Sequence, residues 1–427
     1  MSDTIQGFAK HPWRDFALAE MHARPFTPMA TPRRILHYAF MPEGEARTTD
    51  RQALRAVCEA RGLPGPPKGA KYHRVDFGNF VLRWEGHSEF TTYTFKMPGG
   101  AGNAPFQPPA TDRLDLMRMV PQPGPLLAMV DLHLVPAAQE AAVLDLFGGH
   151  DLAFAEVEGG AAAIATDFRE AADGFVRIAI LDRGLSPMQA GALVQRVLEI
   201  ETYRTLALLG LPTAQELGPA IRRIELQLPQ MMEEMQASRS VEANRTLLDK
   251  LTALAAELER GASASSYRFG ATRAYGELIR LRLDAFGESA VPGRTSWTAF
   301  LNRRLQPALR TCAATQARED DLARRLGRAA QLLRTKVDID LETQNGEVLR
   351  AMNERARLQL RLQQTVEGLS VAAITYYIAS LAHHVFEGMH AGGAHVDPAI
   401  ATAVTVPLVL LGVGYIVWRI RRRHESV

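Results

Sequence analysis

The sequence predicts an α+β or α/β cytoplasmic domain, then a region of long helices, and finally a C-terminal two-helix transmembrane hairpin. Three observations predict it: strand-like runs alternate with helical patterns in residues 1–185, helical periodicity dominates residues 186–364, and two uncharged apolar segments lie in residues 365–427. These segments, 368–386 and 399–418, each cover roughly 30 Å as helices, because an α-helix rises about 1.5 Å per residue. That is the depth of the hydrocarbon core of a bilayer.

Composition excludes several classes of protein. The net charge of +2 over 427 residues gives no bulk attraction to nucleic acid, so no nucleic-acid partner is expected. The two cysteines, Cys58 and Cys312, are far apart and lack histidines at ligand spacing, which excludes a disulfide framework and argues against a zinc finger. The N-terminus has no apolar signal-peptide core, so the first 360 residues are expected in the cytoplasm.

The first 185 residues predict a proline-rich arm followed by a strand-rich domain. Residues 12–21 are expected to form a short helix, after which Pro25, Pro28 and Pro32 impose an extended path. A second helix is expected over 48–61. Aromatic and β-branched runs predict strands at 75–84, 89–95, 126–135, 152–157, 162–168 and 175–181, with a hairpin turn at 85–88. Five or six strands with intervening helices imply a domain with its own core.

Residues 186–364 predict helices and a stalk. Ser186 and Pro187 are suited to start a helix over 188–209 that Gly210 ends, and Thr213 has capping-box spacing for a second helix to about residue 260. Turns are expected at 261–266 and 287–293, and one helix is expected over 296–386. Its narrow apolar stripe predicts packing against partner helices, hence a coiled stalk and a homo-oligomer. The stripe consists of Leu333, Val337, Leu341, Val348, Met352, Leu362, Val366 and Leu369.

The flanks of the two apolar segments predict their orientation. Arginines precede the first segment and follow the second, whereas the loop 387–398 contains no Lys or Arg. Positive residues stay on the cytoplasmic side, so both termini are expected in the cytoplasm and the loop outside. Pro407 is tolerated within the second segment. Tyr376, Tyr377 and two histidines make the first segment less apolar, and its alternative interpretation is a buried helix of a soluble domain.

No catalytic motif points to an enzyme: the chain lacks a phosphate-binding loop ending in Lys-Ser/Thr, a nucleophile elbow, HExxH and a Gly-x-Gly-x-x-Gly after a strand. One dense polar set lies in the N-terminal arm. Either these side chains hydrogen-bond one another and fix the arm to the domain, or they form a catalytic cluster. The set comprises His11, Arg14, Glu20, His22 and Arg24.

The first apolar segment has a polar edge at helical spacing, consisting of Ser370, Tyr377, Ser380, His384 and Glu387. Polar groups at membrane depth face a protein interior or a water-filled path, so these residues are candidates for an ion path. In an oligomer, the first segments would then surround an axis. The alternative is that they only form hydrogen bonds within the hairpin.

The outer loop is a candidate metal site. His383, His384, Glu387 and His390 fall at three- and four-residue spacings, so one helix face can gather several of them. Imidazole and carboxylate groups are ligands of divalent transition metals, which makes a divalent metal ion the one cofactor candidate. The alternative is that these histidines bind lipid headgroups and water.

The N-terminal run His11-Pro12, with His22-Ala-Arg-Pro-Phe26 and Thr31-Pro-Arg-Arg-Ile35, resembles a family of bacterial proteins of unknown function. Its members have about this length and are predicted to be membrane-anchored, and the resemblance covers the whole chain. It implies a place in the bacterial inner membrane and brings no established activity.

The order of cytoplasmic α/β domain, long helix entering the membrane, short outer loop and second span with a basic tail resembles the CorA-type magnesium transporter superfamily. That family has Gly-Met-Asn at the outer end of its first span, where this chain has Gly388-Met389-His390 preceded by Glu387. The resemblance implies a pentamer whose first spans line a pore. Because the family's Asn contributes to recognition of a hydrated cation, His390 puts magnesium selectivity in doubt.

Two functional hypotheses follow. The first is an oligomeric, CorA-like channel, transporter or sensor of a divalent cation in the inner membrane. The second is a membrane-tethered scaffold whose cytoplasmic domain and stalk bind other proteins while the hairpin only anchors the chain.

Overall fold

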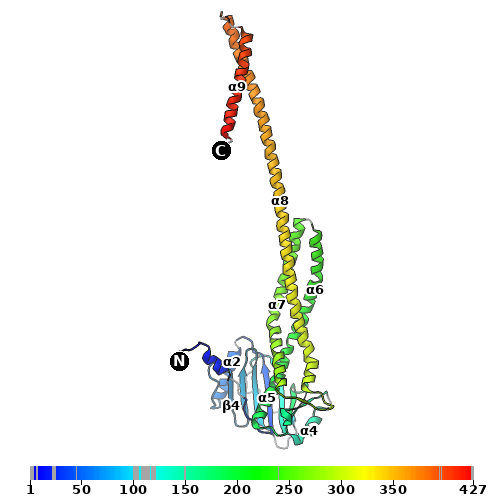
Figure 1. Cartoon of the computed structure of the whole chain (residues 1–427). Helices are drawn as coiled ribbons and strands as arrows, with labels where there is room; N and C mark the ends of the chain where they lie inside the picture. The colour runs from blue at the N-terminus through cyan, green and yellow to red at the C-terminus, as the bar shows by residue number, and fades with distance from the viewer. Residues whose placement is uncertain are drawn as a thin grey trace. The chain divides into compact units, whose positions relative to one another are not determined.

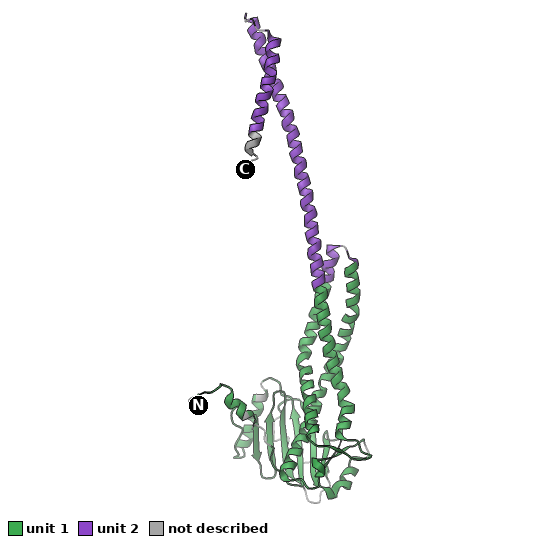
Figure 2. Cartoon of the chain, viewed as in Figure 1, with its two compact units in different colours: residues 1–236, 249–330 green, residues 237–248, 331–427 purple. Residues whose placement is uncertain are grey.

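A computed structural model describes residues 4–5, 8–21, 26–44, 46–99, 105–106, 116, 122–148, 151–238, 240–393, 395 and 397–424. The chain divides into two compact units (Figure 2). Unit 1 comprises residues 1–236 and 249–330, and unit 2 comprises residues 237–248 and 331–427.

Unit 1 is built on a mixed sheet, which confirms the predicted mixed α/β character of the N-terminal domain (Figure 1). Among the described residues the sheet has nine strands in the order β11-β8-β9-β10-β7-β3-β6-β5-β4. The pair β7/β10 is parallel, and the other pairs are antiparallel. The strands are β3 (Arg33–Phe40), β4 (Tyr72–Asp76), β5 (Val81–Gly86), β6 (Thr91–Pro98), β7 (Leu126–Pro136), β8 (Ala153–Val157), β9 (Ala162–Glu170), β10 (Val176–Asp182) and β11 (Ser289–Ala290). The short strands β1 (Thr4–Ile5) and β2 (Phe8–Ala9) pair separately.

Two strand predictions need correction. The sequence pattern predicts no strand in the proline-rich arm, yet β3 is central and pairs with both β6 and β7. Its residues 35–40 are all buried, so β3 shows no polar–apolar alternation. The predicted strand at 75–84 is two strands, because the chain turns at Gly78. The backbone φ of Gly78 is +89°, and its N–H donates to Asp76 Oδ1 at 2.8 Å.

Short helices lie between the strands in sequence, and the long helices follow β10. They are α1 (Arg14–Met21), α2 (Ala46–Glu59), η1 (Ala137–Gln139), α4 (Glu140–Asp145), η2 (Glu158–Gly160), α5 (Pro187–Leu208), α6 (Gly210–Ala237), α7 (Val241–Asp284), α8 (Trp297–Ala391) and α9 (Pro398–His424). The predicted start of α5 is confirmed, since Ser186 and Gln189 form a reciprocal capping box and Pro187 lies in the first turn.

The predicted turns after α5 are partly wrong. Gly210 begins α6, so Thr213 lies inside that helix instead of starting one, and α6 ends at Ala237, well before residue 260. Residues 261–266 continue α7. Small side chains there allow close packing: a Cβ on Gly261 would lie 3.1 Å from Leu217 Cδ2, and Ser265 Oγ donates to Glu319 Oε2 at 3.2 Å. The turn at 287–293 is confirmed.

The long C-terminal helix is confirmed. α8 runs without a break for 95 residues, and α9 follows with 27. In the described residues these are the two helices that are long and apolar enough to cross a membrane. Only 11% of the apolar window in α8 and none of that in α9 is buried. Both helices therefore present apolar surface outward, as membrane spans do and buried core helices do not.

The sheet of unit 1 has a different core on each face. Leu36, Tyr38, Trp84, Tyr93 and Phe95 belong to an aromatic core on one side. On the other side α5 packs with Val194 and Val197 against apolar residues of β7 and β10. Gly191 lets the segment before β3 pass close to α5, because a Cβ there would lie 2.1 Å from the backbone oxygen of Thr27.

Candidate functional site

The C-terminal end of α8 brings three of the predicted metal-site residues together in unit 2. His383 Nε2 lies 3.5 Å from Glu387 Oε1, and His384 Nδ1 lies 3.3 Å from Glu387 Oε2. His390 is one turn further on and exposed. Among the described residues no group of three or more His, Cys, Asp or Glu side chains has an arrangement that could hold a metal ion. The divalent-metal site therefore stays a prediction.

Helix α9 packs on only one face of this part of α8. Thr375 and Ala379 are buried, and a ring nitrogen of His383, Nδ1, lies 2.9 Å from Thr402 Oγ1 of α9. Most residues of the predicted polar edge lie outside this covered face: Tyr377 is 72% exposed, and His384 and Glu387 are exposed too. Ser370 Oγ donates to the carbonyl of Val366, and Ser380 is half-buried. Gly388 and Met389 complete the exposed end of α8.

The N-terminal polar cluster is only partly described. His22 and Arg24 lie outside the described residues. His11 Nδ1 accepts a hydrogen bond from the backbone N–H of Trp13, Arg14 begins α1, and Glu20 accepts from Lys71 Nζ at 2.9 Å. A catalytic role of this set stays a prediction.

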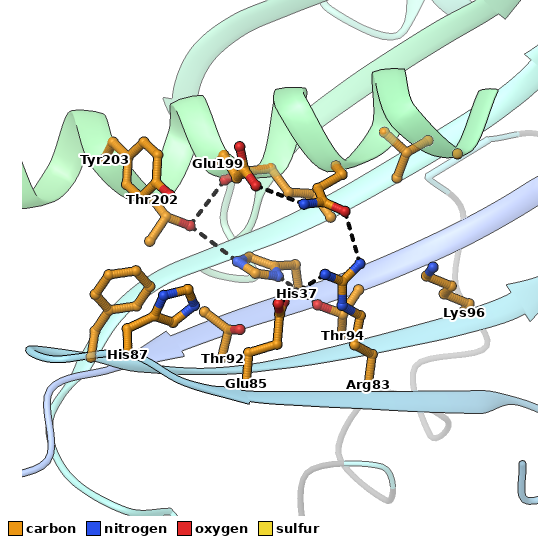
Figure 3. A pocket seen from close by; sticks show the side chains of 15 residues that line it. His37, Arg83, Glu85, His87, Thr92, Thr94, Lys96, Glu199, Thr202 and Tyr203 are labelled. Atoms are coloured by element: carbon orange, nitrogen blue, oxygen red, sulfur yellow. Dashed lines mark hydrogen bonds and ion pairs between the residues drawn. The ribbon is translucent and has the colours of Figure 1, made fainter. Parts of the chain in front are cut away.

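A second candidate site lies in unit 1, between α5 and the strands β3, β5 and β6 (Figure 3). The strand register creates it, because His37, Thr94 and Arg83 are direct neighbours across the three strands. On the same face, Thr92 pairs with Glu85, and Lys96 pairs with Val81. The space within the pocket and its open mouth is about 490 Å³. α5 lines its opposite wall through Gly191, Val194, Gln195, Leu198, Glu199, Thr202 and Tyr203.

An ordered polar network crosses this pocket. Arg83 donates to Glu85 Oε1 at 2.8 Å and to Gln195 Oε1 at 3.0 Å, and Gln195 in turn donates to Glu199 at 2.8 Å. Glu199 also pairs with Arg282 of α7. Arg83 is 4% exposed and Glu85 is 9% exposed, so this ion pair is nearly dry. Such buried pairs hold their partners in a fixed geometry, because breaking one leaves an uncompensated charge.

The pocket holds two bases in an unusual environment. Burial, followed by the positive charge of Arg83, lowers the pKa of His37 to about 3. Burial also lowers the pKa of Lys96 to about 8, with help from Arg83 and Arg74. His37 is therefore neutral at pH 7, whereas Lys96 is mostly charged in a site with little water.

The alternation of polar and aromatic residues in β6 points to this pocket, although by itself it predicts only a strand. In β6 the polar residues Thr92, Thr94 and Lys96 alternate with Tyr93 and Phe95, which is typical of a strand with one covered face. The structure covers both faces: Thr92 and Thr94 are each 3% exposed. A polar strand face beneath a helix could only be recognised once α5 was known to cover it.

Comparison with known proteins gives a family and no function. No curated protein matches the sequence. A family described as "Protein of unknown function (DUF3422)" matches residues 9–424. This confirms the resemblance to an uncharacterised family over the whole chain. Because the match spans nearly every residue, the chain belongs to the DUF3422 family.

Proposed function

We propose that this protein is an oligomeric, CorA-like protein of the bacterial inner membrane that passes or senses a divalent cation, with both termini in the cytoplasm. One observation carries the proposal. A single unbroken helix, α8, begins at the fully buried Trp297 of the sheet-containing unit and ends in a membrane-length apolar segment with His384 and Glu387 at its far end. One continuous helix thus contributes both to a folded domain and to the candidate ion path.

Exposed apolar side chains on α8 support self-association. After the buried Leu333 and Val337 and the half-buried Leu341, the rest of the predicted stripe is exposed. Val348, Met352, Leu362, Val366 and Leu369 are each 53–67% exposed. A narrow apolar stripe of this length on one helix is suited to the same stripe of a second copy, since identical helices bury it in a symmetric bundle. The partner in this proposal is therefore another copy of the chain.

The exposed polar edge of the span supports an ion path. α9 covers the face of α8 that carries Thr375 and His383, and so leaves Tyr377, His384 and Glu387 uncovered within one chain. Exposed carboxylate and imidazole groups are costly against lipid. In a ring of copies they would instead face one another around a central axis, as charged rings do in cation channels.

The test is divalent-cation flux into liposomes that contain the full-length protein. Wild type is expected to pass at least one of Mg²⁺, Co²⁺, Ni²⁺ or Zn²⁺. Glu387→Ala, His384→Ala and His390→Ala are expected to reduce that flux, Glu387→Ala by about tenfold or more, because it removes the negative ring. Glu354→Ala, at an exposed position of α8 before the span, is the matched control and should leave the flux unchanged.

Two outcomes would contradict the proposal. A well-folded oligomer that passes none of the four ions would exclude transport. A monomeric particle, from the mass of the detergent-purified protein, would exclude a pore built from several first spans.

A membrane-tethered scaffold is the second candidate, and one observation favours it. Aromatic residues at the N-terminus lie open to solvent: Phe8 is 76%, Trp13 67% and Phe16 51% exposed. Clustered exposed aromatic side chains are typical of protein-binding surfaces. In this case an unrelated two-span anchor in place of residues 365–427 would preserve the cellular phenotype, whereas loss of the phenotype would favour the ion path.

A further inference from the structure

The pocket between α5 and β3, β5 and β6 lies in unit 1, outside the proposed ion path, and one of its cations lacks a carboxylate partner among the described residues. Two ion pairs are neutral: Arg83 with Glu85, and Glu199 with Arg282. Lys96 is left over. Its Nζ donates to the hydroxyl of Thr27 at 2.7 Å, and no carboxylate pairs with it among the described residues. Lys96 is thus the cation of the pocket lining that has no carboxylate partner in the described part of the chain.

Polar atoms without partners also line the pocket. Arg83 Nε and Thr92 Oγ1 are buried and have no hydrogen-bond partner in the described part of the chain. Both side chains are less than 5% exposed. Buried polar groups in native proteins are almost always hydrogen-bonded, and leaving one unpaired costs about 1–3 kcal/mol. An N–H and a hydroxyl that remain unpaired in a preformed cavity indicate a ligand that accepts hydrogen bonds.

The opposite end of the pocket is aromatic. The ring of His87 stacks on that of Phe90 with centroids 4.1 Å apart, and Phe90 meets Tyr203 edge-on at 6.3 Å. Figure 3 places Lys96 and Arg83 at one end and His87 and Tyr203 at the other. Ligand pockets combine apolar walls with a few convergent polar groups, as this pocket does.

We propose that this pocket binds a small organic monocarboxylate, with its carboxylate at Lys96 and Arg83 and its apolar body along Phe90 and Tyr203. A single negative charge matches Lys96, whose ammonium group has no carboxylate partner among the described residues. The carboxylate oxygens accept from Lys96 Nζ and Arg83 Nε, and a substituent on the body reaches Thr92 Oγ1. A phosphate dianion would leave one negative charge uncompensated in a site with little water. This site is independent of whether the membrane part passes cations.

The test is isothermal titration of the full-length protein in detergent at pH 7 with benzoate, hexanoate, acetate, benzamide and inorganic phosphate. Benzoate or hexanoate is expected to bind more tightly than acetate, because only they fill the aromatic end. Benzamide, which has the shape of benzoate without its charge, is expected not to bind. Lys96→Met is expected to weaken carboxylate binding at least about tenfold, since a hydrogen bond to a charged group is lost.

Two variants keep the result interpretable. Thr92→Val removes a hydroxyl that has no partner, so it should weaken binding without loss of thermal stability. Lys250→Met, at an exposed position of α7 in the same unit, should leave binding unchanged. The proposal is overturned if no carboxylate binds at millimolar concentration, if Lys96→Met binds as wild type does, or if phosphate binds more tightly than benzoate.

Discussion

Replacement of Asp131 by alanine is expected to lower the free energy of unfolding by about 3–5 kcal/mol. Asp131 lies on β7, is fully buried, and accepts two hydrogen bonds from Arg34 of β3, at 3.1 and 2.9 Å. Burial alone would raise the pKa of Asp131, but hydrogen bonds from His133 and Arg34 and their charges lower it to about 2. Alanine would leave the nearly buried guanidinium of Arg34 without a counter-charge at the β3–β7 pair, in the middle of the sheet.

The measurement is urea unfolding of the full-length protein in detergent, followed by tryptophan fluorescence. Asp249→Ala, at an exposed position of α7, is the control and should change the free energy by less than about 0.5 kcal/mol. The double variant Arg34→Met/Asp131→Leu should recover much of the lost stability, because it removes both charges and leaves apolar groups. A double variant as unstable as Asp131→Ala would show that the isolated charge is not the cause.

The membrane-length helices could be predicted from the sequence because length and apolarity are local properties. The same holds for the contacts of Glu387 with His383 and His384, which follow from spacings of four and three residues on one helix. Neither prediction requires knowledge of where a distant segment packs.

Strand β3 could not be predicted for the opposite reason. Its sequence, RRILHYAF, begins with two arginines after three prolines and contains a histidine, which suggests an exposed arm. In the structure, two of these polar groups have partners far along the chain: Arg34 forms an ion pair with Asp131, and His37 hydrogen-bonds Thr94 and Thr202. A strand that is buried on both faces can be recognised from its sequence only when its distant partners are known.

Helix α7 is a second case in which the local sequence pattern gives the wrong prediction. Gly261 and the following Ala and Ser residues have the composition of a turn, yet they continue the helix. Small residues here reflect a close approach to Leu217 and Glu319, not a change of chain direction. Local propensity is overridden when tertiary packing requires small side chains.

Acidification is expected to destabilise unit 1 through His37, by about 5 kcal/mol over the whole range of its titration. Thr202 donates its hydroxyl proton to the carbonyl of Leu198, so it accepts from Nε2–H of His37, and Nδ1 accepts from Thr94. The neutral ring is therefore fully hydrogen-bonded. Protonation would place a charge in a buried site beside Arg83, which is why the pKa of His37 falls to about 3.

The sign follows from linkage. The unfolded chain takes up a proton on this histidine near its ordinary pKa of 6.5, whereas the folded chain does so only near 3. The contribution of His37 to the free energy of unfolding is therefore fully present above pH 6.5 and is lost as the pH falls, by about 2–3 kcal/mol at pH 4.5.

Urea unfolding between pH 7 and 4.5 measures this loss of free energy. The glutamine of His37→Gln can hydrogen-bond both threonines but cannot titrate, so this variant should lose less stability over this pH range. The control His11→Gln, at an exposed position near the N-terminus, should behave as wild type. Equal acid sensitivity of His37→Gln and wild type would contradict a neutral, buried His37.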